Sequence, residues 1–378
     1  MRVNVIGAGP AGLYLSYLLK RRDRLADVRV FEQNPANATF GFGVVFSDRA
    51  LEFLRKDDLE TYDAIAPAME TWSDITLDLE GDVVRIGGVG FSAVGRLELL
   101  KLLQERIRAI GVTVHFERAI NSLEEVKDAD LIVGADGVNS IVRRTYEREF
   151  GTSVGFLTNK FAWYGTTRLF DTLTQTFRRN SDGVFNAHHY RYSPRMSTFI
   201  VETDAVTWQR AGFESMSEPA TRAYLEHVFA DVLDGHGLVS NKSVWRNFPM
   251  VANAQWSAGK AVLLGDALHT AHFSIGSGTR LAMEDAIALA RSIELHPTDA
   301  GAAAHAYHAS RRPVLDKLTM AANSSAQWYE LFAEHMALAP PEFAMSYITR
   351  SGRVDLNRLR TVSPKLVAAY EKHVRSHR

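Results

Sequence analysis

The chain has 378 residues, 46% of them hydrophobic, and no cysteine, so disulfides, a Cys nucleophile, a thiolate zinc site and an iron–sulfur cluster are excluded and redox chemistry needs a bound cofactor. Its 43 Lys and Arg residues against 44 Asp and Glu give a net charge of -1, which argues against a nucleic-acid or anionic-membrane partner. The chain has neither a membrane-length apolar run nor a signal-peptide layout, and we expect a cytoplasmic protein.

The N-terminal segment has the pattern of a βαβ unit. Residues 2–6 are typical of a short buried strand, and a G-x-G-x-x-G turn follows at 7–12. Apolar residues then recur at helical spacing over 13–20, and a second strand is predicted at 28–31. In this order the elements predict a dinucleotide-binding unit rather than an isolated structural turn.

Each glycine of this turn has a physical role. Gly7 allows the tight turn from strand to helix, Gly9 lets the backbone approach a pyrophosphate, and Gly12 lets helix and strand pack closely. The helix N-terminus offers N–H donors and a positive dipole end to phosphate. Glu32 ends the second strand, where a carboxylate can accept hydrogen bonds from a ribose hydroxyl.

Two further strands end in turns of the same kind. An apolar strand over 130–134 leads into D-G-x-x-S-x-x-R at 136–143, and another over 261–264 ends in Gly265-Asp266. The glycines of 276–278 then precede a predicted helix, and they would let backbone amides approach a ring. Each motif alone is compatible with an ordinary turn, but the three together favour a flavin dinucleotide site.

These motifs resemble a known family. The sequences at 7–12, 135–144 and 265–269 resemble, in order and spacing, the single-component (class A) flavoprotein aromatic hydroxylases typified by p-hydroxybenzoate hydroxylase. The resemblance covers the chain to about residue 295. A narrower resemblance, to the subgroup of salicylyl-CoA 5-hydroxylase and anthraniloyl-CoA monooxygenase, is carried by residues 41–48, 161–166, 197–203 and 272–279.

The resemblance implies tightly bound FAD. It places Arg96 near the ribityl or phosphate region, although a surface arginine at a helix start is the alternative, and it places Asp266 on the ribityl chain. The family pattern G-Q-G-x-N is replaced here within 273–280, which leaves those contacts to backbone amides and the helix N-terminus. The FAD-binding residues implied are Gly7, Gly9, Ala11, Gly12, Glu32, Gln33, Val44, Arg96, Asp136, Asp266, Gly276, Ser277, Gly278 and Thr279.

The resemblance also implies the reaction. A nicotinamide cofactor, NADH or NADPH, reduces FAD, and O2 then gives a flavin C4a-hydroperoxide that hydroxylates an aromatic ring. The positive end of the helix that follows residue 277 would stabilise the negative charge of reduced flavin. Because the chain has one dinucleotide fingerprint, NAD(P)H is expected to bind only transiently.

The middle of the chain supplies the predicted substrate pocket. Strands over 184–192 and 196–202 would form a pair, and their alternation puts Asn186, His188, Tyr190 and Tyr192 on one face. His188 and Tyr190 are predicted as catalytic residues that accept or relay the substrate proton. The alternative for each is a packed or solvated sheet residue. The remaining predicted substrate-binding residues are Trp163, Asn186, Tyr192, His272 and Phe273. No metal site is predicted, since no carboxylate triad accompanies His269 and His272 and the flavin site explains their location.

These predictions define a mixed α/β fold. A Rossmann-like FAD-binding domain is expected from residues 1–70, 90–155 and 250–300, with an antiparallel-sheet substrate domain from 71–89 and 156–249. The C-terminal region, 301–378, is expected to be helical, with separate helices over 307–320 and 324–336. These helices would cover the site or build a homodimer, and the sequence leaves both a monomer and a homodimer open.

The narrower resemblance implies a small aromatic substrate, a salicylyl or anthraniloyl thioester hydroxylated at ring position 5. The thioester partner would be CoA or a carrier protein, with Arg178, Arg179, Arg191 and Arg195 as candidates for its phosphates. One alternative is a hydroxylase of a tryptophan-derived or indole metabolite. Another is a flavin-dependent reductase that incorporates no oxygen.

Overall fold

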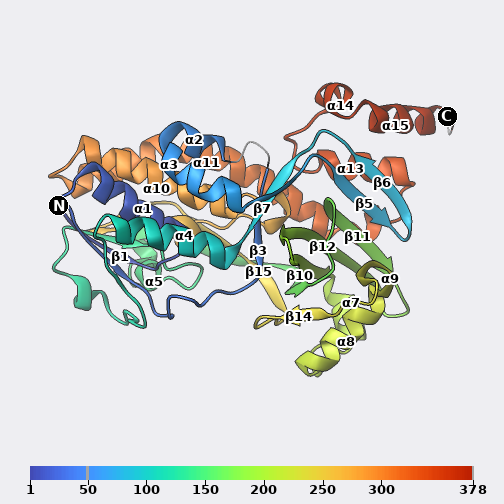
Figure 1. The fold of residues 1–378 in the computed structure, drawn as a ribbon, viewed down its shortest axis with the longest axis horizontal. Coiled ribbons are helices and arrows are strands. Elements are labelled where there is room, and N and C mark those ends of the chain that lie inside the picture. Colours follow the sequence, from blue (N-terminus) through green and yellow to red (C-terminus); the bar gives the residue numbers. More distant parts are fainter. Residues whose placement is uncertain (48–50, 377–378) are drawn as a thin grey trace.

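The computed structural model describes residues 1–47 and 51–376, so Asp48, the last residue of the 41–48 motif, lies outside it. The part of the molecule that holds the N-terminus (Figure 1) contains a six-stranded sheet, and its strand order is β16-β17-β9-β1-β2-β8. All neighbours are parallel except β16 and β17. The strands are β1 (Arg2–Ile6), β2 (Asp27–Phe31), β8 (Val114–His115), β9 (Leu131–Gly134), β16 (Ser257–Ala258) and β17 (Ala261–Leu263).

Three helices cover one face of this sheet: α1 (Pro10–Arg22), α4 (Arg96–Ala109) and α10 (Gly278–Leu295). In α1, Pro10 takes the first helical position, where its missing N–H costs nothing, and residues 11–19 are all buried. Basic residues fill the last turn of α1, which suits the negative end of the helix dipole. The βαβ unit and the mixed α/β fold predicted from the sequence are confirmed.

The second half contains an eight-stranded sheet, and its strand order is β14-β10-β13-β12-β11-β5-β6 with β15 paired to β10. Neighbours are antiparallel except β5 and β11. The predicted pair of strands is confirmed as β12 and β13, with His188 opposite Ile200. The strands are β5 (Ile75–Leu79), β6 (Asp82–Ile86), β10 (Thr152–Thr166), β11 (Leu173–Arg179), β12 (Val184–Ser193), β13 (Met196–Thr203), β14 (Leu238–Ser240) and β15 (Arg246–Asn253).

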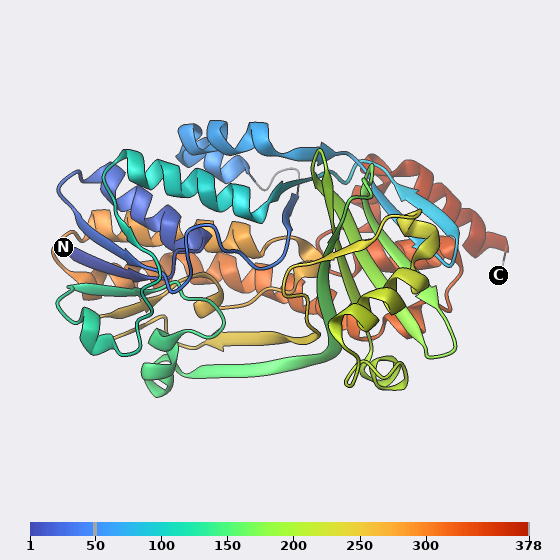
Figure 2. The ribbon, with the colours of Figure 1, turned by 60° about the horizontal axis from the view of Figure 1, so that its bottom comes forward.

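A three-stranded antiparallel sheet lies against β12, formed by β3 (Gly43–Ser47), β7 (Phe91–Gly95) and β4 (Glu70–Trp72). The contact is close because Gly43 has no side chain: a Cβ there would lie 2.5 Å from the Cβ of Tyr192. The two larger sheets are also joined by β10 and β15, which run side by side from one half to the other (Figure 2). Both strands are continuous through the expected limits at 155/156 and 249/250, and the domain division itself stays a prediction.

The C-terminal region is helical, but its first part differs from expectation. One continuous helix, α11 (Ala300–Glu330), replaces the two predicted over 307–320 and 324–336. Residues 321–323 contain no glycine or proline, so nothing in this stretch ends the helix. Tyr307 packs in the core of the first half and Tyr329 in that of the second, so α11 connects both cores.

The remaining helices surround the two halves, and none in the described part of the chain has the length and apolarity needed to cross a membrane. The helices α12 and α13 contribute Phe332, Phe343 and Tyr347 to the core beneath β5 and β11. These remaining helices are α2 (Glu52–Asp57), α3 (Leu59–Ile65), α5 (Ile141–Thr145), α6 (Glu147–Phe150), α7 (Ala205–Arg210), α8 (Glu218–Val228), α9 (Ala230–Leu233), α12 (Phe332–His335), α13 (Pro340–Thr349), α14 (Leu356–Val362) and α15 (Pro364–Ser376).

Phe177 tests this second core. Its ring, on β11, is fully buried and contacts Phe343 of α13 with centroids 4.9 Å apart. We expect Phe177→Ala to lower the free energy of unfolding by about 3–5 kcal/mol, because it removes a large buried ring and leaves a cavity. Chemical denaturation would measure this. Phe156→Ala, at a 66% exposed position of β10, is the matched control and should change stability by about 0.5 kcal/mol or less. Equal losses in both variants would contradict this account of the core.

Candidate active site

A cavity of about 1180 Å³ lies where the two halves meet. Small-ligand sites commonly enclose about 300–1,000 Å³, so this cavity has room for a dinucleotide together with a second molecule. It is lined by residues that follow strands of the six-stranded sheet, by residues of the eight-stranded and three-stranded sheets, and by Tyr347 of α13 with Arg350 after it. Of the predicted site residues, it brings together Gly9, Ala11, Val44, Arg96, Asp266, Gly276, Ser277, Gly278 and Thr279 with Trp163, His188, Tyr190 and Phe273.

The glycine turn before α1 forms one wall of the cavity. Gly7 has φ of +103°, and a Cβ there would lie 2.3 Å from the carbonyl oxygen of Ala135. A Cβ on Gly12 would lie 2.0 Å from the carbonyl oxygen of Gly7. A Cβ on Gly9, by contrast, would meet no atom within 4 Å. Gly7 and Gly12 are therefore needed for packing, whereas Gly9 leaves open space at the helix N-terminus, as a phosphate group requires.

Glu32 holds this turn in place from the end of β2. One carboxylate oxygen accepts a hydrogen bond from Ala8 N at 2.9 Å, and the other accepts bonds from the backbone and side-chain nitrogens of Asn34. Its ribose contact stays a prediction. Gln33 is exposed and does not line the cavity.

Arg96 and Asp266 face the cavity with little internal pairing. Arg96 opens α4, and its Nε donates to Thr39 Oγ1 at 3.1 Å, with no carboxylate within 4 Å among the described residues. Enclosure by the cavity walls raises the pKa of Asp266, although His269 and Arg96 act against it, and lowers the pKa of Arg96. Because Arg96 and Asp266 face the cavity and have few protein partners, they can bind the polar ribityl and phosphate groups of a flavin nucleotide.

Asp136 lies just behind the cavity wall. Its Oδ2 accepts from Ile141 N at 2.7 Å at the start of α5, while its Oδ1 is buried without a partner among the described residues. Burial raises the pKa of this carboxyl. The neighbouring residues Ala135 and Gly137 line the cavity, so Asp136 shapes the turn that they form.

The N-terminus of α10 opens onto the cavity. Gly276 has φ of +58°, and a Cβ there would lie 2.9 Å from Val45 Cγ1, so a glycine lets this turn approach β3. The hydroxyl of Ser277 donates to Ile275 O at 3.2 Å, while a Cβ on Gly278 would meet nothing within 4 Å. The first N–H groups of an 18-residue helix therefore face open space beside the polar pair of Arg96 and Asp266.

Aromatic side chains enclose the other end of the cavity. Phe273 contacts Phe161 with ring centroids 5.0 Å apart and His188 at 5.1 Å. Trp163 packs on the backbone of Gly41, where a Cβ would approach its ring to 2.9 Å. These rings give the cavity an apolar end, and polar groups approach it from β12 and from the C-terminal helices.

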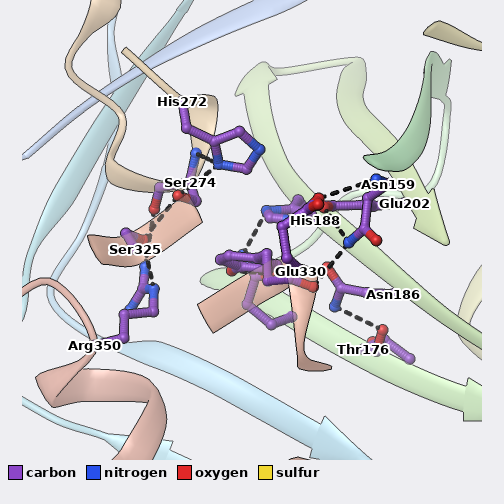
Figure 3. A network of polar contacts seen from close by, with 12 residues as sticks. Asn159, Thr176, Asn186, His188, Glu202, His272, Ser274, Ser325, Glu330 and Arg350 are labelled. Carbon is purple, nitrogen blue, oxygen red and sulfur yellow. Dashed lines mark hydrogen bonds and ion pairs between the residues drawn. The ribbon is translucent and has the colours of Figure 1, made fainter. Parts of the chain in front are cut away.

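His188 is the central polar residue of this end (Figure 3). Its Nδ1 lies 3.1 Å from Gln175 Nε2, and its Nε2 lies 3.3 Å from Glu202 Oε2. Because Gln175 Oε1 accepts from the hydroxyl of Tyr329, its amide donates to Nδ1, which assigns the ring proton to Nε2. Burial lowers the pKa of His188 to about 3, so the ring is neutral and both nitrogens have protein partners.

Glu202 lies behind His188 and is fully buried. Its Oε1 accepts from Asn159 Nδ2 at 3.0 Å, and burial raises the pKa of this carboxyl. The backbone N–H of Asn159 in turn donates to Glu330 Oε1 at 2.9 Å (Figure 3). A continuous polar chain thus leads from the cavity wall through β13 and β10 to the end of α11.

The other predicted residues of β12 have separate contacts. The Tyr190 hydroxyl donates to Gly43 O at 2.9 Å, so it fixes β12 against β3. Asn186 donates to Thr176 O, and Tyr192 packs on Gly43; neither lines the cavity. The catalytic roles of His188 and Tyr190 stay predictions, and each residue already has an internal partner.

His272 belongs to a second polar chain, shown in Figure 3. Its Nδ1 lies 2.8 Å from Ser274 Oγ, which lies 2.8 Å from Ser325 Oγ, and Ser325 accepts from Arg350 Nε at 3.0 Å. His272 is not itself in the cavity wall, but Ser274 and Arg350 are. Sequence reasoning missed Gln175, Glu202, Tyr329 and Arg350 as site residues, and of these only Glu202 lies within a motif, the segment 197–203.

His269 has a structural partner. Its Nε2 lies 2.8 Å from Asp285 Oδ2, and Asp285 also accepts from Arg311 Nε at 2.8 Å. Asp285 further accepts from Gly265 N, which fixes the turn that carries Asp266. Within residues 1–47 and 51–376, no group of three or more His, Asp or Glu side chains is arranged to hold a metal ion.

The arginines suggested for thioester phosphates lie elsewhere. Arg178 pairs with Asp78 and Asp231, Arg179 with Glu80 and Arg191 with Glu70, and these residues and the exposed Arg195 do not line the cavity. A role of these four arginines at the thioester stays a prediction, and Arg178, Arg179 and Arg191 already have acidic partners. The arginines that line the cavity are Arg96, Arg143, Arg144, Arg246 and Arg350.

His272 gives a pH prediction. Burial lowers its pKa from 6.5 to about 4, so between these values only the unfolded chain binds the proton, and the free energy of unfolding must fall as pH falls. His272→Asn keeps an acceptor for Ser274 without titrating. We expect the wild type to lose about 2.5 kcal/mol more than this variant between pH 7 and pH 4.5, measured by urea denaturation. Parallel curves for the two proteins would show that His272 is not held neutral by the fold.

Comparisons with known proteins agree with this geometry. A family model described as an FAD binding domain matches residues 1–322. A salicyloyl-CoA 5-hydroxylase from a Streptomyces species is 44% identical over 361 residues, which cover 93% of this chain and 70% of the relative. A 3-hydroxy-4-methyl-anthranilyl-(aryl-carrier protein) 5-monooxygenase from Streptosporangium sibiricum is 35% identical over 87% of this chain and 89% of the relative.

The fold has solved counterparts as well. The tetrameric form of 2-methyl-3-hydroxypyridine-5-carboxylic acid oxygenase superposes with a TM-score of 0.71 over 95% of each chain, at 18% identity. The family model covers most of the chain, and both curated relatives exceed 30% identity over more than two thirds of their length. The chain therefore belongs to the FAD-binding-domain family, as a flavoprotein aromatic monooxygenase.

Proposed function

We propose that this FAD-dependent, NAD(P)H-consuming monooxygenase hydroxylates an aromatic ring carried on a thioester, a salicylyl or anthraniloyl group, at ring position 5. The observation that carries the proposal is one continuous cavity, which runs from the glycine turn and the α10 N-terminus to the aromatic end around His188. The names of the two curated relatives, one a CoA thioester hydroxylase and one acting on a carrier-bound anthranilyl group, support this substrate class.

The residues present fit FAD. Gly9 and Gly278 leave open the space that phosphate and ring groups need, and the charges of Arg96 and Asp266 face that space. When bound, FAD takes up the reducing equivalents of NAD(P)H and activates O2, chemistry that no side chain of a cysteine-free chain supplies. Gly9 and the start of α1 would hold the pyrophosphate, and the first N–H groups of α10 would stabilise negative charge on the reduced ring.

The aromatic end of the cavity would position the substrate ring and exclude water. Phe161, Trp163 and Phe273 form apolar walls there, and dry walls protect reactive oxygen species from decay in water. Gln175 and His188 hold each other by a hydrogen bond and keep the polar edge of this pocket in one arrangement. Val44 and Val45, on β3, close the side between the pocket and the α10 turn.

The open end of the cavity suits the thioester part. Phe156 is 66% exposed there, and Arg144 and Arg246 are exposed cations without an acidic partner within 4 Å among the described residues. Phosphates of CoA or of a carrier phosphopantetheine carry the opposite charge, so Arg144 and Arg246 are better candidates for binding them than Arg178, Arg179, Arg191 and Arg195. Cytoplasmic location and oligomeric state stay predictions from the sequence.

A substrate panel tests the proposal. FAD-loaded protein would be given NADH or NADPH with salicylate, salicylyl-CoA, anthraniloyl-CoA, a carrier-bound ester and tryptophan. We expect an aryl thioester to accelerate NAD(P)H oxidation at least about tenfold and to yield a hydroxylated product containing label from ¹⁸O2. The reason is that a substrate ring held in the correct position beside the cofactor reacts faster. Product from tryptophan alone would favour the indole alternative, and a product without label would contradict oxygen insertion.

Gly9 tests the cofactor site. We expect Gly9→Ala to weaken FAD binding at least about tenfold, because the methyl group enters the space predicted for the pyrophosphate, while the apoprotein stays as stable as wild type. Flavin fluorescence titration and thermal denaturation of the apoprotein measure the two effects. Gly12→Ala, whose Cβ would meet Gly7 O, should instead destabilise the apoprotein. Unchanged FAD affinity in Gly9→Ala would place the pyrophosphate elsewhere.

A further inference from the structure

Arg350 is the cation at the aromatic end of the cavity. It follows α13, and its guanidinium lies over the ring of Tyr347, 3.8 Å from the centroid. It lines the cavity together with Tyr347, Ser274 and His188. Among the described residues no carboxylate lies within 4 Å of it, whereas most arginines on the sheet nearby are paired with acids. A positive charge without a counter-ion therefore faces the pocket predicted for the substrate ring.

Three acceptors fix the position of this guanidinium. Nε donates to Ser325 Oγ at 3.0 Å and Nη2 to Ser274 O at 2.8 Å (Figure 3), and Nη1 donates to Tyr347 O at 2.6 Å. A guanidinium has five N–H donors, so two remain for a ligand, one on each Nη atom. The hydroxyl of Ser325 then donates to Ser274, and that of Ser274 to His272, so all donors of this chain point away from Arg350.

The groups around Arg350 do not neutralise it. The titratable neighbours are His188 on β12, His272 before α10, Tyr329 on α11 and Tyr347 on α13. Burial is the main cause that lowers the pKa of His188 to about 3 and that of His272 to about 4. The charge of Arg350 also lowers both pKa values. Burial raises the pKa of Tyr329 well above its usual value. These three side chains are therefore neutral at pH 7, and the charge of Arg350 is available to a ligand.

The residues first predicted as bases are less available. Both ring nitrogens of His188 have protein partners, and the hydroxyl of Tyr190 donates to Gly43 O. A fixed cation can lower the pKa of a neighbouring phenol without accepting its proton, since it favours the anion. An arylamine has no corresponding anion at neutral pH, so such a cation does not favour it.

We propose that Arg350 is a specificity-determining residue that holds the hydroxyl of a 2-hydroxyaryl thioester as the phenolate, so that the enzyme selects salicylyl over anthraniloyl substrates. This inference rests on the proposed function and deepens it. The phenolate is the more electron-rich ring, so the same interaction that selects the substrate also activates it. The released proton leaves to solvent when the substrate binds.

The test measures binding without turnover. FAD-loaded protein, without NAD(P)H, would be titrated calorimetrically with salicylyl-CoA and with anthraniloyl-CoA, in buffers of different ionisation enthalpy that report proton release. In the wild type we expect salicylyl-CoA to release a proton near pH 7 and anthraniloyl-CoA to release none. In Arg350→Gln we expect the release to disappear and salicylyl-CoA affinity to fall at least about tenfold, with anthraniloyl-CoA within about twofold.

Two further variants serve as controls. Arg350→Lys keeps the charge and should retain proton release, and Arg353→Gln removes a nearby arginine that does not line the cavity and should behave as wild type. Bound FAD and near-UV circular dichroism report that each variant is folded. Equal loss of affinity for both thioesters in Arg350→Gln, or unchanged proton release, overturns the inference alone. Failure of the wild type to bind either thioester overturns the proposed function and the inference with it.

Discussion

The buried carboxylate of Asp285 holds together the segments on which the cavity depends. It receives a hydrogen bond from Gly265 N, from His269 Nε2 and from Arg311 Nε, and it is fully buried on α10. Burial alone would raise the pKa of Asp285, but His269 and Arg311 hold it below its usual range. The ionised form is thus stabilised by partners from the Gly265 turn and from α11. Asp266 owes its position at the cavity to this cluster, although Asp285 itself does not line the cavity.

Elements shared by the two halves explain how the two large sheets enclose one site. The strands β10 and β15 are continuous from one half to the other, and α11 reaches both cores, so the halves are joined by continuous secondary-structure elements. The walls of the cavity between the halves are thus tied together by continuous strands and by one helix. That is what a hydroxylase needs, because the ring atom to be oxidised must be held close to the cofactor while water is excluded.

The part of the site that the sequence predicts is the part determined locally. Gly7, Gly9 and Gly12 act within one turn. The alternation along β12 predicts Asn186, His188, Tyr190 and Tyr192 on one face, and of these His188 and Tyr190 line the cavity. Arg350 and Gln175 could not be found in this way. Arg350 follows an ordinary amphipathic helix, and it reaches the cavity only because α11 and α13 pack against the second sheet. The break expected near residue 322 failed for a different reason, since helical periodicity does not reveal where a helix ends without a glycine or proline.

A net charge of -1 conceals how charge is distributed in this chain. The described lining of the cavity contains five arginines but only two carboxylates, Glu147 and Asp266, whereas arginines on the outer strands are paired with acids. Acidic side chains therefore pair with arginines on the outer strands, and few of them line the cavity. A dinucleotide, the phosphates of a thioester carrier and a phenolate are all anions, so one distribution of charge serves each of them. Selectivity among these anions then depends on position along the cavity, with Arg96 beside the α10 turn, Arg144 and Arg246 at the open end, and Arg350 at the aromatic end.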